Sequence, residues 1–311
     1  MERSLSIIIV NYKSWGKLKL CLESISKQNG IKISTIVVDN NSDDNNLLSF
    51  KNNYKWVEWV ENSKNFGFAK ACNIGAKHSK SFWNLFLNPD TILIKNSLLS
   101  LINYCSNNSQ HKIIGIKQVD KKFLSTNSFG IFLNFWSLSG LIRPIIRLLK
   151  KKSYKKINSK SVSHPDWISG SFILIRRLDF DLLNGWSENY WMYYEDMDLC
   201  KRAMNNNLKV TLLNDWSCIH FHGESSRKNK KIKIITKSEV IVSSHVYIEQ
   251  HTNARFALIT HISLIMVQFT NLLISIPFSS AKRAIFLNSI SYWLKGILKS
   301  DWNSKRAESN Y

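Results

Sequence analysis

The amino-terminal half of the chain alternates between short, uniformly apolar runs and segments with the spacing of an amphipathic helix. Leu5 to Val10 is a continuous apolar and β-branched run, and Ile36 to Val38 repeats this pattern immediately before Asp39. Runs that are apolar at every position are typical of strands buried on both faces of a sheet. Between the two runs, apolar residues recur at helical spacing, at Leu18, Cys21, Leu22 and Ile25.

The same order of strand, helix and strand continues along the chain. We predict a strand over 56–60, a helix over 69–80 and a strand over 83–87. After a break, the pattern predicts a strand over 167–175, a helix that begins near Glu195, and two short strands over 209–213 and 218–221. This alternation predicts an α/β protein with a Rossmann-like, mostly parallel sheet flanked by helices.

Two regions outside that alternation set the predicted domain organisation. Residues 117–164 are basic and aromatic, and we predict an inserted flap there within a domain of residues 1–230. Residues 231–311 are predicted to form a helical extension whose segment 258–276 is largely apolar. Polar residues interrupt that segment at His261, Gln268 and Asn271. A spanning helix needs about 20 mainly apolar residues, so we favour an interfacial, membrane-associated helix, with a buried helix of the globule as the alternative.

Composition and charge narrow the compartment and the partners. The chain has 43 Lys and Arg against 22 Asp and Glu, a formal net charge of +21, which favours anionic partners such as phosphate esters, acidic lipids or nucleic acids. The five cysteines are scattered without CxxC spacing, as is typical of reduced cytosolic thiols. The apolar run near the amino terminus is too short for a signal peptide. We therefore expect a cytoplasmic protein.

Polar residues follow the predicted strands at their carboxyl ends, where open α/β sheets bind their ligands. Asn11 and Tyr12 follow the first strand, Asp39 follows the second, and the segment Asn88-Pro89-Asp90 follows the strand over 83–87. A carboxylate in that last position suits Mg²⁺ or Mn²⁺ bound to a diphosphate. An Asx-Pro turn that caps a following helix has the same sequence, so both interpretations are open at this point.

A second acidic cluster, Glu195-Asp196-Met197-Asp198, begins the helix predicted near Glu195. Acidic residues in a first helical turn also stabilise a helix through its macrodipole, which is a purely structural role. Aromatic residues, whose faces commonly pack against sugar rings, crowd the chain here: Trp186, Tyr190, Trp191, Tyr193 and Tyr194. A carboxylate in such surroundings is suited to general-base catalysis because its pKa is raised.

Two further segments contain candidate ligands. His220 and His222 alternate in a predicted strand, so they share a face and can meet one cation, although pairs of histidines are also common in structural settings. The segment 65–75 places Asn65, Gly67 and Asn73 around a helix start, where backbone N–H groups and small residues allow a ligand to approach closely. It matches neither a Walker loop nor a dinucleotide fingerprint.

Taken in order, these segments resemble glycosyltransferase family 2, whose inverting enzymes have the GT-A fold, and within it the bacterial rhamnosyltransferase-like branch. The resemblance covers roughly residues 5 to 226. It rests on SIIIVNY at 6–12, VVDNNS at 37–42, NFGFA at 65–69, LNPD at 87–90, WISGS at 167–171 and YEDMDL at 194–199.

The resemblance implies a role for each matching position. Asp90 and His220 are expected to bind Mg²⁺ or Mn²⁺, and Asp196 to be the catalytic base, with Glu195 beside it as a second proton acceptor or an orienting group. Asn88 stands where the Asp-x-Asp signature of the family has its first acid, and His222 stands where glycine is commoner, so the metal assignment is not extended to them. The nucleotide sugar is expected to contact Asn11, Tyr12, Asp39, Asn41, Asn65, Gly67, Asn73, Asn88 and Gly170.

The implied function is transfer of a sugar to a lipid-linked glycan acceptor in bacterial O-antigen or capsule synthesis. L-rhamnose from dTDP-rhamnose is the leading donor, and a UDP-hexose or another deoxysugar is the alternative. The expected location is the cytoplasm, at the anionic inner face of the plasma membrane. From the residues alone, a nucleotidyltransferase and a basic nucleic-acid-binding protein stay open as alternatives. No nucleic-acid-binding module is recognisable in the sequence, so no nucleic acid partner is expected.

Overall fold

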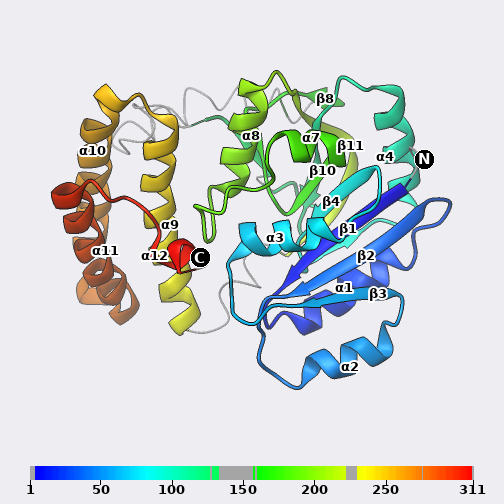
Figure 1. Cartoon of the computed structure of the whole chain (residues 1–311), viewed down its shortest axis with the longest axis horizontal. Helices are drawn as coiled ribbons and strands as arrows, with labels where there is room; N and C mark the ends of the chain where they lie inside the picture. The colour runs from blue at the N-terminus through cyan, green and yellow to red at the C-terminus, as the bar shows by residue number, and fades with distance from the viewer. Residues whose placement is uncertain are drawn as a thin grey trace. The chain divides into compact units, whose positions relative to one another are not determined.

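The structure is a computed structural model that describes residues 4–126, 128–132, 157, 160–221, 230–274 and 276–309. The chain divides into two compact units, each built from separate stretches of sequence (Figure 1). The first, here called the sheet unit, comprises Met1–Ile131, Lys156–Ser187 and Glu195–Ser225. The second, the helical unit, comprises Phe132–Lys155, Glu188–Tyr194 and Ser226–Tyr311. Most of the flap predicted over 117–164 lies outside the described residues, and so does His222.

A mixed sheet forms the centre of the sheet unit (Figure 1). Its strands are β1 (Ser4–Asn11), β2 (Lys32–Asp39), β3 (Val57–Glu61), β4 (Trp83–Leu87), β5 (Thr91–Leu93), β6 (Ile113–Val119), β8 (Val162–Ser163), β10 (Phe172–Arg176) and β11 (Val210–His220). They run in the order β3-β2-β1-β4-β10-β6-β11-β5, and β8 pairs with β11. The pairs β1–β2, β2–β3, β1–β4 and β6–β11 are parallel, whereas β10 is antiparallel to both neighbours and β5 to β11. The predicted α/β class with a mostly parallel sheet is confirmed.

Helices cover both faces of this sheet. They are α1 (Trp15–Ile25), α2 (Asn46–Asn53), α3 (Phe68–Lys77), α4 (Ser97–Asn107), α7 (Arg177–Leu182) and α8 (Glu195–Asn205). The apolar positions that predicted α1 are its buried face, and they share one core cluster with Leu5, Ile7 and Ile9 of β1 and with α4. Because side chains alternate along a strand, the residues between them face the other way. Ile8 accordingly points toward α3.

A glycine sets the close approach of α3 to the sheet. A Cβ added at Gly75 would lie 2.7 Å from Cγ2 of Ile8 and 2.9 Å from Cγ2 of Val38, so a larger residue would push the helix off the strands. At its other end, α3 begins after Gly67, whose φ of 82° is rarely adopted by residues with a side chain. The NFGFA segment therefore places the first turn of α3 firmly beside the carboxyl ends of β1 and β2.

Several predicted elements differ in detail. The strand predicted over 167–175 is divided into β9 (Trp167–Ile168), which pairs with β7 (Phe129–Gly130), and β10, because residues 169–171 form a turn. The two strands predicted over 209–213 and 218–221 are one strand, β11, with an irregular register between Leu213 and Ser217. The helix cap considered for Asn88-Pro89-Asp90 is wrong, since strand β5 follows that turn.

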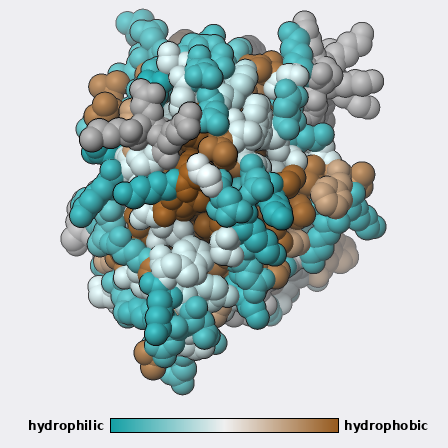
Figure 2. Space-filling view, turned by 90° about the vertical axis from the view of Figure 1, so that its right-hand side faces the viewer, coloured by the Kyte–Doolittle hydropathy of each residue, from teal (hydrophilic) through white to brown (hydrophobic). Residues whose placement is uncertain are grey.

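The exposed side chains of the sheet unit are mostly polar. On the face shown in Figure 2, hydrophilic side chains surround a limited hydrophobic area. The large apolar side chains of this unit that are exposed come from several separate elements and include Leu48, Trp56, Phe123, Leu178, Leu182 and Met204. Scattered exposure of this kind is ordinary for a water-soluble domain.

From Lys230 onward the described part of the helical unit is built from helices, as predicted for the C-terminal extension, whereas Glu188–Tyr194 is a non-helical segment of this unit. The helices are α9 (Lys230–His251), α10 (Ala254–Leu273), a 3₁₀ turn (Ile276–Phe278), α11 (Ser280–Lys299) and α12 (Lys305–Glu308). Asn253 and Ser279 cap the helices that follow them by accepting a hydrogen bond from a backbone N–H. By length and composition, α10 is apolar enough to cross a membrane, which is weak support for membrane contact when taken alone.

Candidate active site

The carboxyl ends of β1 and β2 form a hydrogen-bonded corner. Register pairs Asn11 with Asp39, and both side chains are buried. The Asn11 amide donates to Asp39 Oδ1 at 3.2 Å and to Ser42 Oγ at 3.4 Å, and its oxygen accepts from the backbone N–H of Ser14. Asp39 Oδ2 accepts from the backbone N–H of Ser42 at 3.0 Å. These contacts hold two residues that follow the strands at the edge of the corner: Tyr12, directly after β1, and the half-buried Asn41, two residues after the end of β2.

Asn40, which sequence reasoning did not select, organises the loop before α3. Its amide nitrogen donates to Asn65 Oδ1 and to the carbonyl of Gly67, both at 3.0 Å. Its oxygen accepts from the Asn62 amide at 2.9 Å and from the backbone N–H of Phe66 at 3.0 Å. One buried side chain therefore satisfies four partners and connects the VVDNNS and NFGFA segments. Its place inside the first of those motifs was the only signal in the sequence.

Asp90 and His220 are brought together by the pairing of β5 with β11. Thr91 stands opposite His220 in the register, so Asp90 lies one residue from that pair. Both side chains are buried, and His220 Nε2 lies 3.3 Å from Asp90 Oδ1. The turn that presents Asp90 is closed by the backbone N–H of Thr91, which donates to the carbonyl of Asn88 at 3.1 Å.

Gln118 fixes how His220 meets Asp90. Its amide nitrogen donates to Ser171 Oγ at 2.6 Å, so its oxygen accepts from His220 Nδ1 at 2.8 Å. With Nδ1 protonated, a neutral imidazole turns the lone pair of Nε2 toward the Asp90 carboxylate. Two electron-rich atoms at this separation repel one another unless a proton or a cation lies between them. Sequence reasoning missed Gln118, which carries no motif signal.

The donor pair of Asp90 and His220 fits a divalent cation. Mg²⁺ and Mn²⁺ favour oxygen ligands such as the Asp90 carboxylate, and Mn²⁺, the softer of the two, also accepts an imidazole nitrogen. Bonds of about 2.1 Å to neighbouring octahedral positions place two ligands about 3 Å apart, close to the 3.3 Å observed. Within the part of the chain that the structure describes, no group of three or more His, Cys, Asp or Glu side chains is assembled for a metal. The remaining ligands would therefore be phosphate oxygens and water, as is usual for Mg²⁺.

Asp196 lies in the first turn of α8, against the turn between β9 and β10. Its Oδ2 accepts from the backbone N–H of Gly170 at 3.1 Å, and its Oδ1 accepts from the backbone N–H of Met197 at 2.8 Å. Burial raises the pKa of Asp196, while these two hydrogen bonds oppose the shift. A Cβ at Gly170 would lie 3.4 Å from Cβ of Asp196, an ordinary contact, so the glycine leaves space beside the carboxylate without strain.

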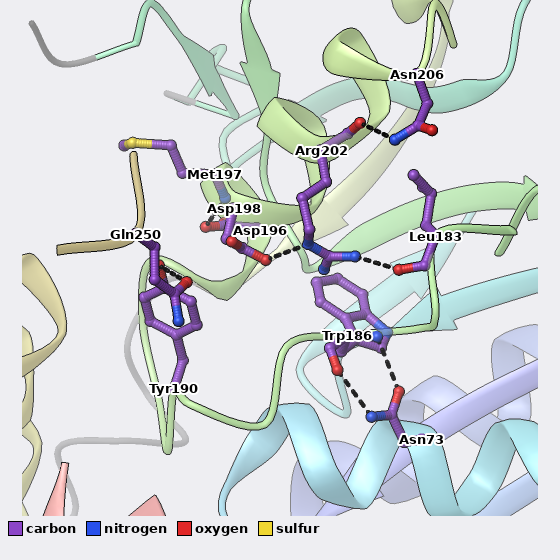
Figure 3. Close-up of polar contacts among 10 residues, drawn as sticks. All are labelled: Asn73, Leu183, Trp186, Tyr190, Asp196, Met197, Asp198, Arg202, Asn206 and Gln250. Carbon is purple, nitrogen blue, oxygen red and sulfur yellow. Dashed lines mark hydrogen bonds and ion pairs between the residues drawn. The ribbon is translucent and has the colours of Figure 1, made fainter. Parts of the chain in front are cut away.

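The two acidic neighbours of Asp196 are in different electrostatic states. Burial, followed by the charges of Asp196 and Asp198, raises the pKa of Glu195 well above its usual range, so the ionised form of Glu195 is disfavoured at this position. Its Oε2 has no hydrogen-bond partner among the described residues. Asp198 is paired with Arg202 at 2.8 Å, and Arg202 also donates to the carbonyl of Leu183 (Figure 3). Asp196, which is partly exposed, is therefore the carboxylate suited to accept a proton.

The predicted aromatic cluster is largely interior. Trp186 is buried and packs edge-on against Phe68 and Phe86, and Tyr190 and Trp191 are buried as well, so these rings are not exposed platforms for a sugar. Asn73 bonds both the carbonyl and the N–H of Trp186, each at 2.9 Å (Figure 3). A Cβ at the adjacent Gly185 would lie 2.7 Å from the Asn73 oxygen. The Asn73 amide thus holds the turn that leads toward α8.

The turn over Ser169, Gly170 and Ser171 connects the two carboxylate sites. Gly170 donates its N–H to Asp196, and the Ser171 hydroxyl accepts from Gln118, which in turn contacts the partner of Asp90. The carbonyl of Ser171 accepts from the backbone N–H of Asn88 at 3.0 Å. Asp90 and Asp196, distant along the chain, are therefore each attached to the same three-residue turn through short hydrogen-bonded paths.

Comparison with known proteins identifies the class. The model of the family described as glycosyl transferase family 2 matches residues 6–179, more than half of the chain. The chain is 28% identical over 229 residues to rhamnosyltransferase WbbL of Escherichia coli K12, which covers 71% of this chain and 84% of that protein. It is 24% identical over 217 residues to the N-acetylglucosaminyl-diphospho-decaprenol L-rhamnosyltransferase of Mycobacterium tuberculosis, covering 65% of this chain and 71% of that protein.

The fold comparison agrees. The crystal structure of GalNAc-T7 with UDP, GalNAc and Mn²⁺ superposes with a TM-score of 0.56 at 16% identity, covering 76% of this chain and 48% of that chain. This chain belongs to glycosyl transferase family 2 and is a glycosyltransferase. The predicted resemblance to the rhamnosyltransferase-like branch and the GT-A fold are confirmed, and the nucleotidyltransferase and nucleic-acid-binding alternatives are set aside.

Proposed function

We propose that the chain is an inverting, divalent-metal-dependent glycosyltransferase in which Asp196 is the general base and Asp90 with His220 binds Mg²⁺ or Mn²⁺. The observation that carries this proposal is the attachment of both sites to the turn at Ser169–Ser171, which fixes a proton acceptor and a cation-binding pair relative to one another. A reaction between a diphosphate leaving group and an acceptor hydroxyl needs both groups at one centre.

The nucleotide sugar is proposed to bind at the carboxyl ends of β1, β2 and β4. Asn11 and Asn73 have their amides engaged with protein groups, so we assign them to positioning. Asp39 is held by Asn11 and by the segment at Ser42. The partly exposed Tyr12, Asn41, Asn65 and Asn88 then provide the direct side-chain contacts, and the buried Gly67 and Gly170 contribute their backbone.

The chemistry follows from where charge develops. When bound, the cation supplies Lewis-acid stabilisation of the negative charge that accumulates on the nucleoside diphosphate. The relative GalNAc-T7 was crystallised with Mn²⁺, which supports this assignment. Asp196 accepts the proton of the acceptor hydroxyl as its oxygen attacks the anomeric carbon and the bond to the diphosphate breaks. Attack from the face opposite the leaving group inverts the anomeric configuration and forms no sugar–enzyme bond.

The donor and acceptor are proposed from the relatives and the charge. The Escherichia coli and Mycobacterium tuberculosis relatives described above are both named rhamnosyltransferases, so dTDP-L-rhamnose is the leading donor. The name of the mycobacterial relative describes a sugar linked to a polyprenyl diphosphate, which supports a lipid-linked acceptor in the synthesis of O-antigen or capsule. We place the enzyme in the cytoplasm at the inner face of the bacterial plasma membrane, with residues 1–230 as the catalytic domain and 231–311 as the membrane-associating extension.

The test uses the purified full-length chain with dTDP-L-rhamnose, a short-chain prenyl diphosphate N-acetylglucosamine and Mn²⁺. We expect release of dTDP, transfer to the acceptor and an inverted anomeric configuration by NMR, with all three lost on chelation of the metal. Retained configuration would contradict Asp196 as a base acting opposite the leaving group. Full activity after exhaustive chelation would contradict the metal assignment, and activity with a different nucleotide sugar alone would replace the donor.

A further inference from the structure

The helical unit exposes apolar side chains on the outer surface of α10 and α11. Along α10, Leu258, Ile262 and Met266 are 58%, 43% and 62% exposed and recur every fourth residue, so they form one stripe. Further exposed apolar side chains belong to these helices and the turn between them: Phe256, Ile259, Leu273, Ile274, Phe278, Leu287, Leu294, Ile297 and Leu298. The sheet unit shows no comparable concentration within its described residues.

The inner surface of α10 is largely polar, although Leu264 and Ala257 also pack there against Ile248 of α9. Thr260 and His261 are fully buried, and His261 Nδ1 lies 2.8 Å from Nδ1 of His245 on α9. His245 Nε2 donates to the oxygen of Gln268 at 3.2 Å, and the Gln268 nitrogen donates to Ser244 on α9. A helix that packs in water buries its apolar side and exposes its polar side. In α10 this arrangement is reversed, as in helices that associate through hydrogen bonds while their outer surface meets lipid.

The charge on these helices fits one kind of apolar partner. From Ala254 to Lys299 the sequence has no Asp or Glu, while it contains Arg255, Lys282, Arg283, Lys295 and Lys299. Lys295 is paired with Asp301, whereas Arg255, Lys282, Arg283 and Lys299 are exposed. A surface that is apolar and basic without acidic residues is complementary to the boundary between acyl chains and anionic head groups. A second copy would bring the same positive charge and would be repelled.

We propose that the outer surface of α10 and α11 inserts into the head-group and acyl boundary of an anionic bilayer, with the polar side of α10 kept against α9. The helix lies in the interface and does not span the membrane, because its buried polar contacts with α9 run along one side from His261 to Gln268. This inference rests on the proposed function in one respect: contact with the bilayer would bring the enzyme to the proposed lipid-linked acceptor.

Flotation of the full-length chain with vesicles tests the surface directly. We expect binding to vesicles of phosphatidylcholine mixed with an equal part of phosphatidylglycerol, and weaker binding to phosphatidylcholine alone. The triple variant L258E/I262E/M266E should lose flotation on both. The matched control L48E/L178E/L182E, which alters three exposed leucines of the sheet unit, should float as the wild type does. The variant K282Q/R283Q should bind anionic vesicles about 25-fold more weakly, about fivefold for each charge removed.

A labelling experiment keeps the proposal testable if the triple variant fails to fold. All five native cysteines are buried, so an environment-sensitive dye on M266C reports one position. Its emission should shift to the blue on anionic vesicles, while the same dye on L48C should not change. Absence of wild-type flotation together with an unshifted dye would overturn the proposal. So would a lipid-free dimer that light scattering detects and that the triple variant dissolves.

The catalytic proposal can fail separately from this one. Hydrolysis of the donor, measured without vesicles, should be equal in the wild type and in L258E/I262E/M266E. If donor hydrolysis is absent from both while flotation behaves as expected, the proposed reaction is wrong and the lipid surface stands. If hydrolysis is normal and flotation is absent, the surface is wrong and the reaction stands.

Discussion

Replacement of Asp196 by Asn separates the chemical role of this side chain from its structural one. Asn has the same shape and keeps an oxygen, but its amide cannot accept a proton at neutral pH. In the structure both Asp196 oxygens accept backbone N–H bonds, from Gly170 and Met197. The Asn oxygen can retain one of them, while the NH₂ group faces the donor of the other.

The expected effect on stability is small. Losing one of these hydrogen bonds costs about 1 kcal/mol. In the opposite direction, burial raises the pKa of Asp196, which means that the ionised form is penalised on folding and that a neutral amide relieves this penalty. The two effects oppose each other, so the free energy of unfolding should stay within about 1 kcal/mol of the wild type. A domain with a typical stability of 5–15 kcal/mol then remains folded.

The expected effect on turnover is large. General-base assistance contributes about 100- to 10,000-fold, or roughly 3 to 5 kcal/mol of barrier, several times the expected change in stability. Asp196→Asn should therefore lower kcat by at least about 100-fold while the affinity for dTDP, measured by calorimetry, is retained. Glu195→Gln is the matched control: because burial raises the pKa of Glu195 and disfavours its ionised form, exchanging it for a neutral amide should reduce kcat less than tenfold.

The pH dependence follows with a definite sign. Because the pKa of Asp196 is raised, the active, ionised form appears only as pH rises through that higher value, so the ascending limb of the kcat profile should lie above the usual range of a carboxylate. Over the same interval the folded state binds more protons than the unfolded state, so this group makes the protein less stable as pH rises. Retention of a tenth or more of wild-type kcat by the Asn variant, or loss of dTDP affinity with kcat intact, would refute the reasoning.

Three further outcomes are expected. Gln118→Leu should weaken Mn²⁺ binding in calorimetry by about 10- to 100-fold, since residues that hydrogen-bond to metal ligands orient them. Gln118→Glu still accepts from His220 Nδ1 and should retain most of the affinity. Equal Mn²⁺ affinities of the two variants would refute the tautomer argument. Asp198→Asn should lower the free energy of unfolding by roughly 2 kcal/mol, less than for a fully buried pair because Arg202 is partly exposed, with kcat of the folded protein unchanged. Acidification should destabilise the helical unit. Burial and His261 lower the pKa of His245 from 6.5 to about 3. As the pH is lowered between these two values, the free energy of unfolding should therefore decrease by about 1.4 kcal/mol per pH unit. Denaturant titrations of the wild type and His245→Gln at several pH values check this, and equal slopes would count against it.

The features predicted well from the sequence are those encoded by short segments. Largely apolar runs predicted β1, β2 and β4, because a strand covered on both faces is apolar at most positions, with Ser6 and Asn84 as buried polar exceptions. The polar residues after them were predictable because parallel strands end at one edge of the sheet. The position of Asp39 and Asp90 at the carboxyl ends of their strands could therefore be predicted without knowing their distant partners.

The features that sequence reasoning missed depend on long-range pairing. Gln118 is important because β11 passes beside β6 and brings His220 to it, and no local pattern encodes that neighbour. In the sequence nothing distinguishes Asn40 from the neighbouring Asn41. Only the fold of the loop at 62–67 shows that the Asn40 amide is the one that bonds this loop. The aromatic cluster was misjudged for the same reason, since burial of Trp186 depends on Phe68 and Phe86 from other elements.

The three-residue turn between β9 and β10 limits how such an enzyme can be redesigned. Substitutions at the rim, such as at Tyr12 or Asn41, can alter donor preference while the proton acceptor stays in place. Removing the Ser171 hydroxyl takes away the acceptor of Gln118, and any change that displaces the backbone of the turn also moves the Gly170 N–H that donates to Asp196, so such changes can affect both halves of the reaction. Libraries that aim to exchange the sugar without losing rate should therefore leave this turn as it is and vary the strand ends around it.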